Sequence, residues 1–354
     1  MGQTQQAVAE AAAGVFGGYR PGPAAGQDGG HDHALWKELA RAGLLGLDVP
    51  GWLGGEGLGV ADTAVLLTEA GRAAAPVPAL ATLAMGVLPV TRWGSRDQQR
   101  ALLAGVPAGD ALLTAAVRET SEPMPPGPAT TVTPEDGTVS GVKIGVPHAA
   151  AASWILVPAS LGPGGTGIAV VAPSAPGVTL RRTPSSSGAP EYTLRLDGAP
   201  VVHVLGNGRA VADLYQLTAA AAACVADGAL AAALALTTGH VRSRRQFGRP
   251  LATFQAVAQQ IADVAIASRT LHLAALSACW RLDTGRDAAD DTEVAAYWLA
   301  EEAPAAMRAC HHLHGGTGMD VSYPLHRYSA LAKDLVSLVG GADYRLGRLG
   351  AGIG

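Results

Sequence analysis

Three arginines, an aromatic ring and a turn lie together in one short stretch of this 354-residue chain. Residues 244–251 read RRQFGRPL, and Phe254 and Gln255 follow. Guanidinium groups bind phosphate oxygens through paired hydrogen bonds, and a phenylalanine can stack on a flat ring. The stretch therefore predicts a site for an anion joined to an aromatic ring. The alternative is structural, because arginines also favour the negative C-terminal end of a helix.

The stretch interrupts two runs with helical periodicity. An apolar run over residues 218–241 precedes it, and the periodicity resumes over residues 252–270. Gly248 and Pro250 are the residues that break the pattern. The arginines are thus expected on a turn between two helices of one bundle.

A second motif lies near the C-terminus. Residues 312–319 read HLHGGTGM, and residues 323–327 read YPLHR. Together with the arginine-rich stretch, at this spacing, the chain resembles the acyl-CoA dehydrogenase flavoproteins. The resemblance implies FAD as cofactor. It also implies a set of residues that contact its pyrophosphate and adenine side: Arg244, Phe247, Gln255, His312, Gly315 and Gly316.

The N-terminal third resembles the same family. Residues 42–50 read AGLLGLDVP and residues 54–59 read GGEGLG. Leu35, Trp36 and Leu39 recur at helical spacing just before them, and further helices are expected over residues 60–73, 78–91 and 96–104. Residues 1 to about 30, rich in Gly, Ala and Gln, are expected to be loosely ordered at the start.

The middle of the chain changes to short runs rich in Val and Thr, separated by turns. Strands are expected over residues 129–133, 138–143, 154–158, 167–172, 179–182 and 192–196,. Long helices follow over residues 210–241, 252–284, 290–315 and 324–338,. The predicted fold is α+β and mainly α: an N-terminal helical domain (1–110), a central small β-barrel domain (111–205) and a C-terminal four-helix bundle (206–354).

The catalytic base of the family is missing. In the family a carboxylate removes the α-proton of an acyl-CoA thioester while the β-hydrogen leaves as hydride to the flavin. The two positions that carry this base in family members hold Val339 and Thr218, and Ala219 stands where an arginine usually follows the second. We therefore expect no catalytic base in this chain, unless Asp343 replaces it after a shift of about one helical turn, roughly 5 Å.

The residues expected to contact the flavin ring also depart from the family. Residues 119–127 read ETSEPMPPG where members carry a Thr-Glu-Pro-x-x-Gly-Ser segment. Gly145 replaces a tryptophan, and Pro147 replaces a hydroxyl residue and lacks an amide donor,. The residue types that contact the flavin ring in the family are thus missing, whereas those that contact the ADP half of FAD are present.

This asymmetry predicts a hetero-oligomer. In the family, one chain holds the flavin ring and base while its neighbour contributes the Arg-x-x-Phe-Gly segment and the Gly-Gly turn. The chain resembles the second subunit of actinobacterial enzymes that dehydrogenate steroid side-chain CoA thioesters. A homologous base-bearing subunit, an acyl-CoA substrate and an electron-transfer acceptor are the expected partners. Two alternatives remain: a self-sufficient homomeric flavoenzyme using Asp343, and a non-catalytic structural partner.

Composition argues against nucleic-acid-binding, secreted and membrane-spanning proteins. The formal charge of −4 and the lack of a wider basic face argue against nucleic acid,. Cys224, Cys279 and Cys310 lie in apolar helical runs, which favours a reducing compartment. No signal peptide is evident at the start. The apolar run over residues 218–236 is Ala-rich and includes Asp227, so we expect a bundle helix rather than a membrane span, and a cytoplasmic protein.

Two local motifs suggest other ligands. His311 and His314 lie one helical turn apart, which is a spacing for metal ligands, but a helix-end role fits better and no metal is expected. The glycines of residues 315–318 lack the preceding strand and following lysine of a nucleotide-triphosphate loop,. A helix C-terminus with close backbone approach is the expected structure there.

Overall fold

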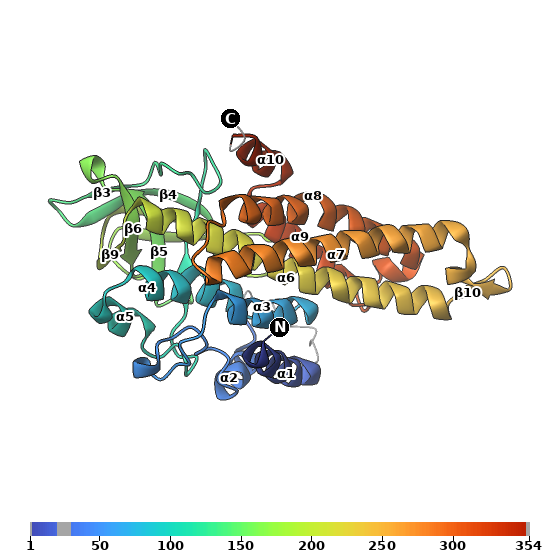
Figure 1. The fold of residues 1–354 in the computed structure, drawn as a ribbon. Helices are drawn as coiled ribbons and strands as arrows, with labels where there is room; N and C mark the ends of the chain where they lie inside the picture. Colours follow the sequence, from blue (N-terminus) through green and yellow to red (C-terminus); the bar gives the residue numbers. More distant parts are fainter. Residues whose placement is uncertain (1, 20–29, 352–354) are drawn as a thin grey trace.

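A computed structural model describes residues 2–19 and 30–351 of the chain. Helices of the N-terminal region, a central sheet and a long helical bundle follow one another along the sequence (Figure 1). The mainly α architecture with a central sheet agrees with the fold class expected from the sequence. Figure 1 places the sheet at one end of the bundle and the β10 hairpin at the other.

The N-terminal region packs amphipathic helices around Trp36 and Leu39, which are almost fully buried. Asp32 caps the second helix by accepting a hydrogen bond from the amide of Leu35 at 2.9 Å,. The elements are α1 (Gln3–Gly18), α2 (His33–Arg41), α3 (Val60–Arg72), the π-helical η2 (Leu80–Val87), α4 (Leu88–Trp93) and α5 (Arg96–Leu103).

The start of the chain differs from the expectation of loose order. Residues 3–18 form α1, because Val8, Ala12 and Phe16 recur every four residues and are buried on one face of the helix,. α1 packs against α3. The same expectation also covered residues 20–29, which lie outside the described residues.

The central sheet has nine strands, three of which, β1, β2 and β9, the sequence did not predict. The strands are β1 (Leu113–Ala115), β2 (Arg118–Glu119), β3 (Thr131–Thr133), β4 (Thr138–Pro147), β5 (Trp154–Ser160), β6 (Thr166–Val171), β7 (Val178–Thr183), β8 (Glu191–Pro200) and β9 (His203–Leu205). They follow the order β7-β8-β4-β3-β5-β6-β9, with β1 on β5 and β2 on β4. Val139, Val157 and Leu194, from β4, β5 and β8, meet in one core, so the sheet curls around its own interior,.

The bundle consists of α6 (Gly208–Ser243), α7 (Gln255–Asp283), α8 (Ala289–His314) and α9 (Leu325–Val339), with α10 (Ala342–Ala351) after them. α10 was not predicted. α6 is the central helix and contacts α3, α7, α8 and α9. Its small side chains permit close approach: a methyl group at Gly228 would lie 1.8 Å from the Thr68 carbonyl oxygen of α3,.

α6 and α7 are each long and apolar enough to cross a membrane. In α6, 78% of the most apolar stretch is buried inside the protein, so its hydrophobicity is explained by its place in the bundle core,. The corresponding stretch of α7 is 33% buried. The exposed face of α7 carries Ile266, Leu273, Leu276 and Trp280.

Asp48 is a buried carboxyl group in the N-terminal region. It accepts a hydrogen bond from the Thr63 hydroxyl. Burial raises its pKa to about 7, and the Thr63 hydrogen bond opposes this shift,. Because the folded pKa exceeds the ordinary value of about 4, protonated Asp48 favours the folded state. This contribution is complete below about pH 4 and is lost as the pH rises through 7.

We therefore expect Asp48→Asn to flatten the loss of stability between pH 5 and pH 8. Asparagine stays neutral. The free energy of unfolding of the variant, relative to that of the wild type, therefore rises by roughly 1 kcal/mol or more between pH 5 and pH 8. Urea unfolding at several pH values measures the difference. Asp136→Asn, at an exposed turn, is the control and keeps the wild-type profile. Equal profiles for all three proteins would contradict a buried titrating Asp48.

Candidate functional site

The arginine-rich stretch forms a two-stranded hairpin between α6 and α7. β10 (Arg245–Gln246) pairs antiparallel with β11 (Arg249–Pro250). Phe247 and Gly248 form the two-residue tip, with φ of 51° and 80°. Two left-handed residues are the geometry of a type I′ turn, which matches the twist of a hairpin. Phenylalanine rarely adopts this conformation, so the sequence keeps an aromatic ring at the tip at a cost in backbone strain.

The hairpin offers its cationic and aromatic groups to solvent. The Phe247 side chain is 90% exposed. Arg245 Nη2 donates to the Gly248 carbonyl at 3.0 Å, and the Arg249 guanidinium lies 4.0 Å from the centre of the Phe254 ring. The Arg244 side chain is exposed, and no hydrogen bond or ion pair involves it within residues 2–19 and 30–351. The exposed Arg244 and Phe247 side chains are accessible to a ligand outside the chain.

The second motif lies at the same end of the bundle. His240, in the last turn of α6, stacks on His314, the last residue of α8, with ring centres 4.5 Å apart. His314 Nε2 is hydrogen-bonded to the Tyr323 hydroxyl at 3.0 Å. Gly315 then ends α8 with a φ of 57°,. Figure 1 shows the hairpin beyond this end, away from the sheet.

The residues expected from the sequence to contact the ADP side of FAD are therefore on one end of the bundle and exposed. His312, Gly315 and Gly316 lie on the surface, and Gln255 is the first residue of α7. A methyl group added at Gly315 or Gly316 would meet nothing within 4 Å. The space above the Gly-Gly turn is open for the approach of another molecule. Beside it, an open groove of about 720 Å³ follows the end of α6 and reaches Tyr323 and Tyr328.

His311 and His314 are occupied by hydrogen bonds. His311 Nδ1 is bonded to the Gly318 carbonyl at 3.0 Å, and its Nε2 to the Ser329 hydroxyl at 2.6 Å. His314 Nδ1 is bonded to the Cys310 carbonyl at 2.8 Å. In the described part of the chain, no group of three His, Cys, Asp or Glu side chains is arranged to hold a metal ion. These histidines fix the turn after α8.

The two expected base positions are buried and carry no carboxylate. Val339, the last residue of α9, is fully buried. Thr218 is fully buried in α6 and donates its hydroxyl proton to the Leu214 carbonyl at 2.8 Å,. Asp343 lies in the first turn of α10 and is exposed. It is two residues from buried Arg345, about 200° around the helix, so it faces away from the interior that Arg345 enters.

Arg118 lies beside Gly145, the position where the family is expected to carry a tryptophan. A methyl group at Gly145 would lie 2.5 Å from Arg118 Nη1. Gly145 also has a φ of 61°, which a larger residue adopts only with strain,. A tryptophan therefore cannot stand here without displacing Arg118. That Gly145 replaces a tryptophan stays a prediction from the sequence, whereas the contact with Arg118 is found only in the structure.

A buried ion pair fixes the start and end of the segment over residues 119–130. Lys143 Nζ donates to Glu119 Oε1 at 2.7 Å, and both side chains are buried. Glu119 also accepts from the amides of Ala129 and Thr130 and from the Thr130 hydroxyl. Desolvation raises the pKa of Glu119, but these hydrogen bonds outweigh it and hold the pKa low. Burial lowers the pKa of Lys143 to about 8, against the effect of Glu119,.

Comparison with known proteins identifies the scaffold. The acyl-CoA dehydrogenase N-terminal domain matches residues 3–110, and the acyl-CoA dehydrogenase C-terminal domain matches residues 207–346. This chain belongs to the acyl-CoA dehydrogenase family. Members of the family are oxidoreductases that use FAD as cofactor.

Individual relatives cover almost the whole chain. Acyl-CoA dehydrogenase FadE28 of Mycobacterium tuberculosis is 47% identical over 89% of this chain and 91% of its own length. FadE27 of the same organism is 31% identical over 90% and 87%. Among solved structures, the Tcur3481-Tcur3483 steroid ACAD superimposes with a TM-score of 0.92 at 36% identity, covering 99% of this chain and 97% of that one. The ChsE4-ChsE5 complex from M. tuberculosis gives 0.91 at 29%, covering 100% and 98%.

We expect Lys143→Met to destabilise the protein by about 3–5 kcal/mol, because it leaves the buried Glu119 carboxylate without its cation. Urea unfolding at pH 7 measures the loss. Lys333→Met, at an exposed position on α9, is the control and changes stability by roughly 0.5 kcal/mol at most,. A loss for Lys143→Met as small as that of the control would show that the pair does not hold this segment.

Proposed function

We propose that this chain is the base-lacking subunit of a heteromeric, FAD-dependent acyl-CoA dehydrogenase. It contributes the hairpin and the turn after α8 to FAD bound mainly by a homologous subunit that carries the catalytic base. The reaction is α,β-desaturation of an acyl-CoA thioester. The reduced cofactor is reoxidised by an electron-transfer acceptor, and the enzyme works in the cytoplasm.

One observation supports this proposal above the others. The hairpin retains a strained phenylalanine that is 90% exposed, with arginines around it, whereas Val339 and Thr218 are buried without a carboxylate. Backbone strain of this kind clusters at functional sites, and an exposed strained tip fits a contact with a neighbouring chain. A partner that supplies the base explains both features together.

The residues at the hairpin end fit the ADP half of FAD. Arg244 can pair with pyrophosphate oxygens, and the Phe247 ring can stack on a flat ring system. Gln255 and His312 offer further polar contacts, and Gly315 and Gly316 let a ligand approach the backbone. When bound, FAD supplies the acceptor for the β-hydride. This chain would hold the pyrophosphate and adenine of FAD, so that the flavin ring is fixed in the partner's site.

The residues on the ring side do not fit a flavin. A side chain added at Gly145, the expected position of the ring-covering tryptophan, would meet Arg118 Nη1 at 2.5 Å. Pro147 lacks a hydroxyl and an amide proton. Because this side cannot hold the ring, we derive no step of the reaction in this chain's own cleft.

The relatives support a paired assembly and a steroid substrate. Two of the similar structures are a steroid ACAD of two named components and a complex of two named chains. The exposed apolar stripe on α7, formed by Ile266, Leu273, Leu276 and Trp280, supports a protein partner, because monomeric proteins rarely leave such a stripe uncovered,. We propose an acyl-CoA with a steroid acyl group as substrate.

Asp343 is a weaker candidate for a relocated base, because it lies on the exposed side of α10 and away from the buried interior. A purely structural partner would not need the arginines of the hairpin. Both alternatives can be separated from the proposal with purified protein.

We expect Arg244→Ala and Phe247→Ala to weaken FAD retention by the heteromer by roughly tenfold or more each, because each removes a charge-assisted or stacking contact. The chain is co-expressed with a base-bearing homologue, and bound flavin is measured by absorbance after dilution. Dehydrogenation of an acyl-CoA with a dye acceptor falls in parallel. Arg195→Ala, on an exposed residue of β8, is the matched control and leaves both readouts unchanged.

The isolated chain provides the decisive counter-test. Purified alone, it is expected to bind FAD at far less than one equivalent and to give no flavin bleaching with acyl-CoA. Stoichiometric FAD that an acyl-CoA reduces would refute the heteromer and favour the homomeric enzyme. A heteromer that keeps full flavin and activity with both hairpin variants would favour a structural partner.

A further inference from the structure

The two segments that line the active site in the family touch each other in this chain. One is the segment over residues 119–127, which corresponds to the ring-contacting segment of active members. The other is the turn after Val339, at the expected base position. A cofactor ring and an acyl chain need space between two such segments. Here, a methyl group at Gly340 would lie only 2.6 Å from Pro123 Cβ, so the backbone of the turn is packed directly on Pro123.

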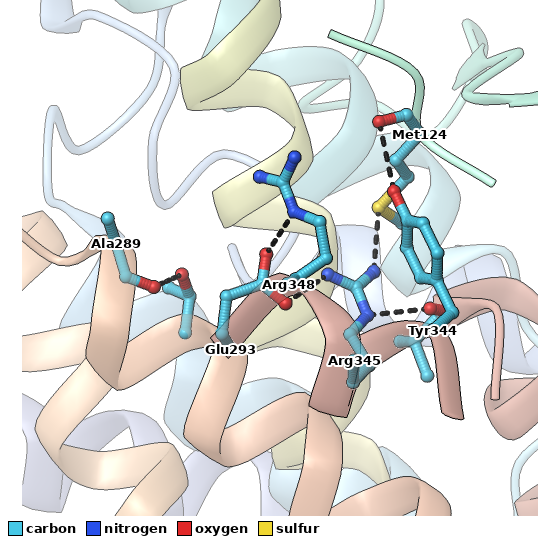
Figure 2. Close-up of polar contacts among 8 residues, drawn as sticks. Met124, Ala289, Glu293, Tyr344, Arg345 and Arg348 are labelled. Carbon is cyan, nitrogen blue, oxygen red and sulfur yellow. Dashed lines mark hydrogen bonds and ion pairs between the residues drawn. The ribbon is translucent and has the colours of Figure 1, made fainter. Parts of the chain in front are cut away.

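Arg345 joins the two segments (Figure 2). It is only 2% exposed, and its Nε donates to the Val339 carbonyl at 2.6 Å. Its Nη2 reaches the Met124 sulfur at 3.0 Å, and its Nη1 pairs with Glu293 of α8 at 2.9 Å. One guanidinium group thus contacts the base-position turn, the 119–127 segment and the bundle at once.

Two tyrosines hold the same segment from other elements. The Tyr344 hydroxyl donates to the Met124 carbonyl at 3.3 Å, as Figure 2 shows, and the Tyr215 hydroxyl of α6 donates to the Pro125 carbonyl at 3.1 Å. Met124 is 2% exposed and has a φ of 52°. A buried methionine in a left-handed conformation persists only where its surroundings impose it. Hydrogen bonds from other elements therefore hold the backbone carbonyl groups of Met124 and Pro125.

We infer that residues 123–125 are a built-in plug, latched by Arg345, that closes this chain's own flavin-ring cleft. The plug adds to the absence of a catalytic base, because residues 123–125 fill the space that the flavin ring would need. This inference rests on the proposed function for the meaning of the cleft, but the latch itself is a property of the chain alone. In a heteromer it directs the cofactor to the one cleft that the partner keeps open.

The test for the latch is hydrogen exchange of the isolated full-length chain. Backbone amides in peptides over residues 119–128 are expected to be protected, and Arg345→Lys is expected to speed their exchange by roughly tenfold or more, because lysine cannot make the three contacts at once. Arg348→Ala is the matched control. Arg348 Nε pairs with the same Glu293 at 3.3 Å, but no hydrogen bond joins it to the plug within the described chain.

The outcomes separate the latch from a general loss of stability. Faster exchange confined to residues 119–128 in Arg345→Lys, with wild-type rates in Arg348→Ala, supports the plug. Unchanged exchange in Arg345→Lys, or wild-type amides there that exchange as fast as the chain ends, overturns it. Should Arg345→Lys unfold, Tyr344→Phe removes one hydrogen bond to Met124 and is expected to give a smaller increase in the same peptides.

A second readout uses the heteromer. Flavin absorbance against protein content is expected to give one FAD per pair of chains. Two FAD per pair would overturn the plug and leave the heteromer intact. Failure of the chains to assemble, or absence of flavin, would overturn the proposed function, while the exchange experiment would still decide the plug.

Discussion

The close packing of α6 is the constraint on which the rest of the structure depends. This helix is 36 residues long, and its middle is composed almost entirely of small residues. Because Gly228 and Gly71 have no side chains, the backbones of α3 and α6 approach closely, with Gly71 against the Val225 carbonyl,. The same helix positions Tyr215 near the sheet, Thr218 in the core and the arginine hairpin at its far end. A single helix therefore positions both the segment around Pro125, which we infer closes a cleft, and the exposed hairpin, which we propose contacts the partner's cofactor.

The two ends differ in how their polar groups are satisfied. At the hairpin end, Arg244 and Phe247 are exposed, and the Phe247 ring meets the Phe254 ring edge-on with centres 6.2 Å apart. At the other, Arg345 is buried and has three partners within the chain. Exposed arginines remain available for a ligand, whereas a buried guanidinium with satisfied donors stabilises the fold. Under the proposed function, the exposed end is the half of a flavin site that contacts the partner's cofactor, and the buried end is the half that has become protein core.

The sequence predicted the features that depend on local pattern. Helical periodicity identified the four bundle helices, and the two motifs lie at the same end of the bundle. Their role in binding the cofactor stays a prediction. It did not predict α1, α10 or the filled cleft. Arg345 and Met124 are 221 residues apart, and nothing in either local sequence indicates that they meet. The loss of a tryptophan at Gly145 stays a prediction, and the position of Arg118 beside it follows only from the pairing of β2 with β4.

The contact between Arg118 and Gly145 bears on whether substitutions could turn this chain into a self-sufficient enzyme. A tryptophan restored at position 145 would collide with Arg118, and a carboxylate restored at Val339 would enter a buried position beside the Arg345 latch. Each single reversion lowers stability before it gains any chemistry. Under the proposed function, packing thus opposes a return to a self-sufficient enzyme, because neighbouring side chains fill the space and several substitutions would be needed at once.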